Sequence, residues 1–224
     1  MTSGSEREQV VLVYRGPASL PGCPEAVAAS VAAAGLLPRY VGPRERLRLE
    51  ARTLAAAAAY AQPGGDELEL AWPLLRRTAP MIRSYVAAGG SYLGFCLGAY
   101  LAGRSPGFDL LPGDTDQYTA SPTATVRHDR DTVVTVQWRG RPRTVFFQDG
   151  ACIYLEPDAE AEVVARYPDG RPAAVVCGYG RGRVGVVGPH PEATEDWFTD
   201  AGLEPPRHLA TDLAVDLVTT TLRR

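Results

Sequence analysis

The chain has 224 residues, 45% of them hydrophobic, which is enough material for one compact domain with a sizeable core. A formal net charge of -3 and an isoelectric point near 5.7 argue against a nucleic-acid or anionic-membrane partner, because both require a clustered basic surface. The sequence contains no lysine, which excludes a P-loop lysine, a Schiff-base lysine and a Ser-Lys dyad.

The first half of the chain alternates predicted strands and helices. We expect strands at residues 9–14, 39–41, 54–61 and 91–95, and helices at 24–37, 44–52, 68–75, 80–88 and 97–104. Residues 54–61 are rich in alanine and could also be helical, but the glycine turn that follows favours a buried strand. Such alternation is typical of a parallel sheet covered on both faces, with ligand sites at the carboxyl ends of its strands.

The second half is β-rich and divided by turn sequences. We expect strands at residues 123–128, 132–138, 143–147, 152–155, 162–167, 173–176 and 184–187, paired as hairpins, and an amphipathic helix at 209–222. The sequence thus predicts an α/β fold with a single domain over residues 9–222 and a flexible segment at 1–8. That segment lacks the apolar core of a signal peptide, so we expect a cytoplasmic protein.

The stretch from Gly94 to Gly103, GFCLGAYLAG, joins a predicted strand to a predicted helix through Cys96. A sharp strand-to-helix turn crowds the positions two residues before and after its centre, and Gly94 and Gly98 would relieve that crowding. The helix amino end stabilises a thiolate, and the N–H of Leu97 would be free to bind an oxyanion. The alternative is a buried structural cysteine between packing glycines, but the flanking strand and helix favour a nucleophile.

A thiol nucleophile requires a base, and the chain offers His128, His190 and His208. His128 lies among charged residues and fits an exposed surface position, whereas His208 starts the last predicted helix. His190 follows an apolar strand and is held between two prolines, and Glu192 lies two residues on, where it could orient the imidazole. The alternative is a rigid turn with an incidental histidine. Neither the histidines nor the cysteines have metal-ligand spacing, so we expect no metal, and no organic cofactor is suggested.

These motifs together resemble the class I glutamine amidotransferase superfamily and, within it, the family of the N-terminal domain of biotin–protein ligases. The matching segments are VYRGPAS, QPGGDE, AAGGSYLGFCLGAYLAG, FFQDGACIY and VGPHPE. The resemblance implies a flavodoxin-like three-layer sandwich with a central, mostly parallel sheet. It also implies a triad of Cys96 as nucleophile, His190 as base and Glu192 as orienting acid, with the second oxyanion N–H coming from Gly65.

One position departs from the family pattern. Glutamine-hydrolysing members usually carry glutamine where this chain has Tyr100, which makes glutamine a doubtful substrate. The chain also lacks a synthetase domain, so released ammonia would need a separate acceptor or synthetase protein. Further candidates for substrate contacts are Arg15, Gly16, Gly64, Tyr100 and Gln148. Arg15 could bind a carboxylate bidentately or be an ordinary surface arginine, and the loop of Gln148 could cover the site or be a hairpin turn.

We therefore predict a cysteine-dependent amidase or amidotransferase-like enzyme that forms a thioester on a small amide or ester substrate. The first alternative is a module on the same fold that binds a metabolite or partner protein without turnover. A redox or glyoxalase-type protein is the second alternative. It is disfavoured because such proteins commonly have an acid beside the thiol, where this chain has Arg15 and Gly16.

Overall fold

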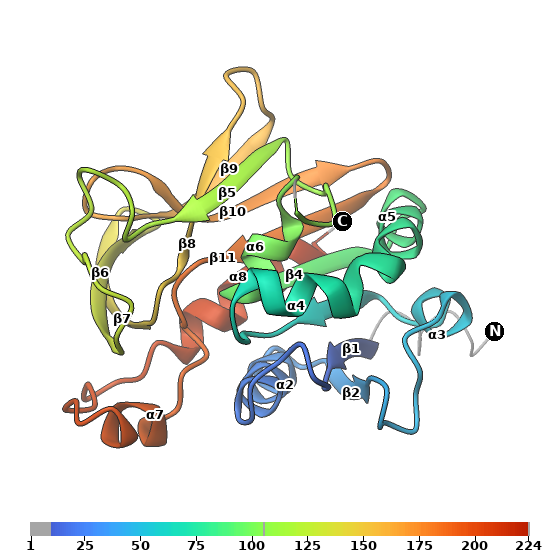
Figure 1. Ribbon diagram of the computed structural model, residues 1–224, viewed down its shortest axis with the longest axis horizontal. Coiled ribbons are helices and arrows are strands. Elements are labelled where there is room, and N and C mark those ends of the chain that lie inside the picture. The colour runs from blue at the N-terminus through green and yellow to red at the C-terminus, as the bar shows by residue number, and fades with distance from the viewer. Residues whose placement is uncertain (1–9, 105, 224) are drawn as a thin grey trace.

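A nine-stranded sheet forms the centre of the computed structural model, which describes residues 10–104 and 106–223 (Figure 1). In spatial order its strands are β2 (Leu37–Val41), β1 (Val10–Tyr14), β3 (Ala59–Gln62), β4 (Ser91–Phe95), β11 (Gly182–Val187), β10 (Pro172–Tyr179), β9 (Ala161–Arg166), β6 (Thr132–Trp138) and β7 (Arg141–Phe147). A separate pair joins β5 (Gly113–Gln117) to β8 (Ala151–Leu155). The predicted flexible segment 1–8 lies outside the described residues.

The two ends of the large sheet differ in strand direction. The five neighbours β2, β1, β3, β4 and β11 run parallel, whereas β10, β9, β6 and β7 add to them as antiparallel strands. The predicted α/β fold, with a parallel core and hairpin additions from the second half, is confirmed.

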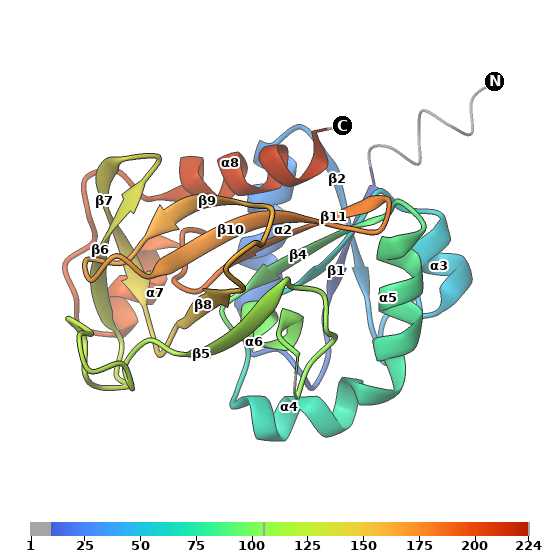
Figure 2. The ribbon, with the colours of Figure 1, turned by 90° about the horizontal axis from the view of Figure 1, so that it is seen from above.

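Helices cover both faces of the parallel part (Figure 2). On one face lie α2 (Cys23–Ala33) and α8 (Thr211–Leu222), and on the other lie α3 (Ala51–Ala55), α4 (Leu68–Leu75), α5 (Ala79–Ala87) and α6 (Leu97–Ala102). A 3-10 turn, η1 (Arg76–Thr78), links α4 to α5, and α7 (Glu195–Asp200) follows β11. Side chains of β1 alternate between the two cores, with Val11 and Val13 in one and Leu12 and Tyr14 in the other, as a strand buried on both faces requires.

The strand register brings three connections to the same edge. Gln62 of β3 is level with Gly94 of β4, and Phe95 of β4 is level with Val187 of β11. The residues after these strands therefore emerge side by side at the carboxyl edge, where parallel sheets build ligand sites. This edge receives the turn 63–65, Cys96 and the segment 188–192.

Some predicted elements are wrong. Residues 44–52 do not form a helix, because Leu47 makes a bridge with Val41 and Glu45 pairs with Arg15; only α3 follows, from Ala51. The strand predicted at residues 54–61 is also misplaced: α3 ends at Ala55, and the strand β3 covers only Ala59–Gln62. Residues 123–128 form an irregular loop rather than a strand, and the sequence does not predict β5 or α7. Acidic side chains and a leading glycine give β5 a weak β signal.

The other boundaries agree with prediction to within a few residues. The last helix begins at Thr211, so His208 precedes it. Among the described residues, we find no helix with the length and apolar character needed to cross a membrane.

Candidate active site

Cys96 occupies a strained turn between β4 and α6. Its backbone angles are φ 49° and ψ -105°, a region that residues with a side chain rarely adopt. A β-carbon added at Gly94 would lie 2.4 Å from the carbonyl oxygen of Gly98, and one added at Gly98 would lie 2.1 Å from that of Gln62. Both positions therefore accept only glycine, for the steric reason expected at a nucleophile elbow.

His190 and Glu192 form a buried pair beyond the end of β11. Nδ1 of His190 lies 2.8 Å from Oε1 of Glu192, and the two residues are 3% and 2% exposed. The backbone N–H of His190 donates to the carbonyl of Phe146 at 2.9 Å, which fixes the chain at this point. Because Glu192 occupies Nδ1, the other ring nitrogen, Nε2, is left to act on a neighbour.

The charges around His190 favour its protonated form. Burial, the strongest single influence, would lower the pKa of this imidazole, but the charges of Cys96 and Glu192 and hydrogen bonds to both outweigh burial and raise the pKa well above its ordinary value. Both neighbours, Cys96 and Glu192, therefore favour the imidazolium over the neutral ring. Oε2 of Glu192 is buried and has no hydrogen-bond partner among the described residues.

The side chains of His190 and two cysteines meet around Gly64. A β-carbon on Gly64 would lie 3.0 Å from Cε1 of His190, 3.3 Å from Sγ of Cys23 and 3.7 Å from Cβ of Cys96. Glycine at this position keeps the space between thiol and imidazole open. The structure thus brings the predicted nucleophile and base together and adds a second thiol beside them.

Gly65 and Leu97, the predicted oxyanion donors, are in contact. A β-carbon on Gly65 would lie 2.4 Å from Cδ2 of Leu97. Within the described part of the chain, the backbone N–H of neither residue donates a hydrogen bond. Both N–H groups are therefore free to donate to a bound ligand.

The loop Gln148-Asp149-Gly150 lies over the thiol. Sγ of Cys96 donates to the carbonyl of Gln148 at 3.8 Å, and the hydroxyl of Tyr100 donates to the carbonyl of Asp149 at 2.9 Å. Chiefly through burial, and also through the charge of Asp149, the pKa of Tyr100 is raised, so its hydroxyl stays protonated and donates. Tyr100 thus contacts this loop.

Two of the predicted substrate contacts lie away from the cavity. The guanidinium of Arg15 is bound by both oxygens of Glu45 at 2.8 and 3.0 Å and by Glu25 at 3.1 Å, and it stacks 3.7 Å from the ring centre of Tyr40. Gly16 packs against Tyr14. The structure does not bring Arg15 or Gly16 to the candidate site.

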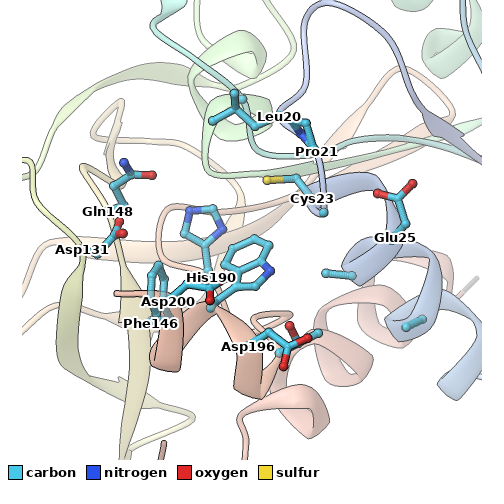
Figure 3. Close-up of a pocket in the computed structure, with 16 residues that line it drawn as sticks. Leu20, Pro21, Cys23, Glu25, Asp131, Phe146, Gln148, His190, Asp196 and Asp200 are labelled. Carbon is cyan, nitrogen blue, oxygen red and sulfur yellow. The ribbon is translucent and has the colours of Figure 1, made fainter. Parts of the chain in front are cut away.

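A cavity of about 690 Å³ opens in front of His190, with Cys23 on one side of the imidazole and Gln148 and Asp131 on the other (Figure 3). The residues that line it come from the loop before α2 and α2 itself, from the turn after β3, from the ends of β6 and β7, and from the segment after β11 with α7. They are Leu20, Pro21, Gly22, Cys23, Glu25, Ala26, Ala29, Gly65, Asp131, Phe146, Gln148, His190, Thr194, Asp196, Trp197 and Asp200. The predicted site residues Gly65, Gln148 and His190 therefore share one cavity.

Several residues of the site were not predicted from the sequence. The sequence gives Cys23 no role, and in the structure burial, more than any other influence, raises the pKa of its thiol. Phe146 and Trp197 form an aromatic wall, with ring centres 5.6 Å apart, and Trp197 lies 5.2 Å from the ring of His190. Buried Gln62 donates to the carbonyl of Ala18 at 3.0 Å and holds the loop before α2. Gln62 and Phe146 lie in segments that match the family, but the sequence gives neither a role of its own, and Cys23 and Trp197 lie in no motif.

A metal centre finds no support in the described residues, where no three His, Cys, Asp or Glu side chains are placed to hold an ion.

Comparison with known proteins links this geometry to a family. Residues 9–118, slightly less than half of the chain, match the family described as "Biotin-protein ligase, N terminal". This segment includes the turn 63–65 and the elbow of Cys96. The predicted family resemblance is confirmed. No match was found among curated proteins.

Solved structures share the amidotransferase-like fold of this chain. A glutamine amidotransferase from Thermotoga maritima superposes with a TM-score of 0.64 and 15% identity, covering 97% of this chain and 99% of that chain. A protein described as cytoplasmic, from Salmonella typhimurium LT2, gives 0.53 and 14%, with coverages of 95% and 99%.

A third match is to part of a larger enzyme. The GH42 β-galactosidase Gan42B from G. stearothermophilus gives a TM-score of 0.54 at 15% identity, covering 95% of this chain. This chain spans only 29% of that enzyme. At these identities the three likenesses establish the fold alone.

Proposed function

We propose that the protein is a cysteine-dependent amidase or amidotransferase-like enzyme that uses a Cys96-His190-Glu192 triad on an amide or ester. The observation that carries the proposal is the meeting of a strained elbow thiol with a buried, carboxylate-bound imidazole around Gly64. Strain of this kind persists where function requires it. The likeness to a glutamine amidotransferase of the same fold supports the class of chemistry.

In the first half-reaction, Sγ of Cys96 attacks the carbonyl carbon of the substrate. The carbonyl oxygen gains negative charge and accepts hydrogen bonds that the N–H groups of Gly65 and Leu97 would donate. His190 then gives a proton from Nε2 to the leaving amine or alcohol. The carbon–nitrogen or carbon–oxygen bond breaks, and the acyl group remains on Cys96 as a thioester.

In the second half-reaction, water or another acceptor attacks the thioester. His190 takes the proton of the acceptor, the carbon–sulfur bond breaks and the thiol is restored. Glu192 holds Nδ1 throughout and stabilises the imidazolium whenever it forms. With water the product is an acid, and with a different acceptor it is a transferred acyl group.

The proposed substrate is an amide or ester other than glutamine. Tyr100 stands where glutamine-hydrolysing relatives carry glutamine, and its hydroxyl is engaged by the loop over the thiol. If ammonia is released for a further reaction, the proposal assigns its uptake to a separate acceptor or synthetase protein.

A binding module without turnover is the second candidate. It is favoured by the low exposure of Cys96, which is 8%, and by the absence of this thiol from the residues that line the cavity. On this reading a ligand occupies the cavity while the thiol stays covered by the loop of Gln148.

Alkylation of the four thiols distinguishes the two. The folded protein is treated with iodoacetamide across a pH series, and each cysteine is followed by peptide mass spectrometry. We expect Cys96 to react fastest and to lose this advantage in His190→Ala, with buried Cys152 and Cys177 as internal controls.

A panel of nitrophenyl esters then tests acylation directly. An acyl adduct on Cys96, absent from Cys96→Ala and slowed in His190→Ala, supports the enzyme. If Cys96 reacts no faster than Cys177 and no adduct forms, the binding module is the correct reading.

A further inference from the structure

The cavity in front of His190 has an acidic rim and apolar walls. Carboxylates of Glu25, Asp131, Asp196 and Asp200 line it, and no arginine does. Since the chain has no lysine, His190 is the sole basic side chain among the residues that line the cavity. This acidic cavity is also the one onto which the proposed base, His190, and the proposed oxyanion donor, Gly65, open.

Three of the four carboxylates form no ion pair in the part of the chain that the structure describes. Glu25 pairs with Arg15 at 3.1 Å, but within the described ranges Asp131, Asp196 and Asp200 make no ion pair. Arg130 lines an adjoining hollow that shares Asp131 and Gln148 with this cavity, but it does not line the cavity itself. Apart from His190, which is paired with Glu192, the charged side chains that line the cavity are all acidic, and a concave site of this kind concentrates cationic ligands.

The carboxylate of Asp200 is placed at a local cost, whereas Asp196 lies in the first turn of α7, where the helix dipole favours negative charge. Asp196 and Asp200 are four residues apart, so they share one face of the helix and repel each other. Asp200 is also the last residue of the helix, where the helix dipole disfavours negative charge. Sequences break local rules of this kind mainly at functional positions.

Aromatic rings complete the site for a cation. Phe146 is 4% exposed and packs edge-on to Trp197, with ring centres 5.6 Å apart, and both rings line the cavity beside these carboxylates. Aromatic rings attract ammonium and guanidinium groups through their electron-rich faces and bind the apolar part of the same molecule.

Resting on the proposed function, we infer that this site selects amide or ester substrates that carry a cationic group, an ammonium or a guanidinium. The cation lies between the rim carboxylates of α7 and Asp131. The apolar part of the substrate contacts Trp197 and Phe146, and the acyl carbonyl extends past His190 toward Cys96. An anionic substrate of the same shape is rejected.

Binding of three ligands of one shape tests the inference without any need for turnover. Benzamidinium, benzamide and benzoate are titrated while tryptophan fluorescence is followed, and Trp197→Phe identifies the responding ring. We expect benzamidinium to bind at least about tenfold more tightly than benzamide, and benzoate more weakly still. The double variant Asp196→Asn/Asp200→Asn should reduce this preference about fivefold or more. The matched control is Asp158→Asn/Glu160→Gln, two exposed acids remote from the cavity.

Alkylation separates this inference from the proposed chemistry. In a Cys23→Ala background, Cys96 is treated with 2-bromoethylamine, iodoacetamide or iodoacetate, and each rate is divided by the rate with free cysteine. We expect the cationic reagent to be favoured at Cys96 and the preference to fall in the α7 double variant.

Each result has a defined meaning. Equal binding of the three ligands, no saturable binding of benzamidinium, or a preference unchanged in the double variant overturns the cationic substrate class. If Cys96 labelling still depends on His190 in that case, the proposed function stands. Selective, aspartate-dependent binding together with labelling that ignores His190 supports the inference about charge and overturns the triad chemistry.

Discussion

Glu192 is a buried carboxylate in which only one of the two oxygens has a hydrogen-bond partner among the described residues. Oε1 accepts from His190, whereas Oε2 has no partner among the described residues. An unsatisfied buried acceptor costs about 1–3 kcal/mol, so a site that served stability alone would gain from an apolar replacement. The pair is better explained by its effect on His190, whose charged form it stabilises.

Replacing Glu192 by glutamine keeps the shape of the side chain and removes its charge. We expect the pKa of His190 to fall toward its ordinary value of about 6.5, because one of the two charges that raise it is gone. NMR titration of the imidazole protons measures this directly, since the chain has only three histidines. Glu204→Gln, an exposed acid, is the control. An unchanged titration of His190 would contradict the assigned role of Glu192.

The raised pKa of His190 also sets a pH dependence of stability. Because the folded pKa lies above the unfolded one, the contribution is complete below pH of about 6.5 and is lost as pH rises through the folded pKa. The difference in free energy of unfolding between wild type and Glu192→Gln should therefore shrink as pH rises above about 6.5. Urea unfolding at a series of pH values measures it, and a difference that grows with pH would contradict the assignment.

The sequence identifies those site residues whose positions are determined by their immediate neighbours in the chain. Cys96 stands between glycines, and His190 and Glu192 are held by prolines, so their neighbours in sequence are also their determinants in space. Trp197, Phe146 and Cys23 reach the cavity only because β7, α7 and α2 converge. No local pattern encodes that convergence.

At the scale of elements, the elbow is the feature most tightly determined by sterics. The helix α6 passes so close to the end of β3 that the position of Gly98 faces the carbonyl of Gln62. Helix propensity favours alanine over glycine by about 1 kcal/mol, yet glycine is required here, so close packing outweighs propensity.

Gly98→Ala should lower the free energy of unfolding by about 3 kcal/mol, because the added methyl group would displace backbone rather than a flexible side chain. Thermal or urea unfolding measures the change. Gly178→Ala is the matched control: nothing lies within 4 Å of its added carbon, and the change should stay within about 0.5 kcal/mol. Equal stabilities of the two variants would show that the elbow is not close-packed.

The loop over the thiol is held in an unfavourable backbone conformation by hydrogen bonds. Asp149 has φ 43°, and its carboxylate accepts from Gln117 and from Thr119, each at 2.8 Å. Tyr100 adds a bond to its carbonyl. The loop therefore depends on three residues that come from α6 and from the segment that includes β5.

Tyr100→Phe removes one of these bonds and leaves the ring in place. We expect a loss of about 1 kcal/mol in stability and a severalfold faster alkylation of Cys96, since the loosened loop uncovers the thiol. Tyr179→Phe serves as the control. An alkylation rate that stays at the wild-type value would mean that the loop does not limit access.

Elements were predictable where one strong periodic signal acted alone. The apolar run of β4 and the alternation in β6 gave strands with the observed bounds, Ser91–Phe95 and Thr132–Trp138. The helix predicted for the charged segment 44–52 is wrong because residues of this segment make tertiary contacts instead: Glu45 pairs with Arg15, and Leu47 forms a β-bridge with Val41. Tertiary contacts override local propensity in such segments.

At the scale of the whole molecule, the matched family segment is not a structural unit. It ends at residue 118, whereas β4 pairs with β11 and α2 packs beside α8, both from the far end of the chain. Cys96 lies inside the segment, and His190 and Glu192 lie outside it. The proposed chemistry thus requires both ends of the chain to fold together.

A fragment of residues 1–118 should therefore fail to fold. Without β11 and α8, the face of β4 that carries Leu93 and Phe95 loses its cover, and the strand becomes an open, apolar edge. Far-UV circular dichroism and proton–nitrogen NMR spectra measure this, with the full chain as control. The full chain should unfold in one transition by both probes, as a single domain over 9–222 predicts. A folded fragment would contradict that domain assignment.

The proposed catalytic residues and the acidic rim of the cavity differ in how freely evolution can replace them. The parts proposed to do chemistry sit on turns at the ends of β3, β4 and β11, where glycines and strain leave almost no room for replacement. Asp131, Asp196 and Asp200 instead sit on the exposed border of the cavity, where a new side chain meets mainly solvent. Single substitutions at the rim can therefore change which substrates bind without disturbing the fold. Substitutions at the strained turns that carry the proposed catalytic residues are tolerated far less.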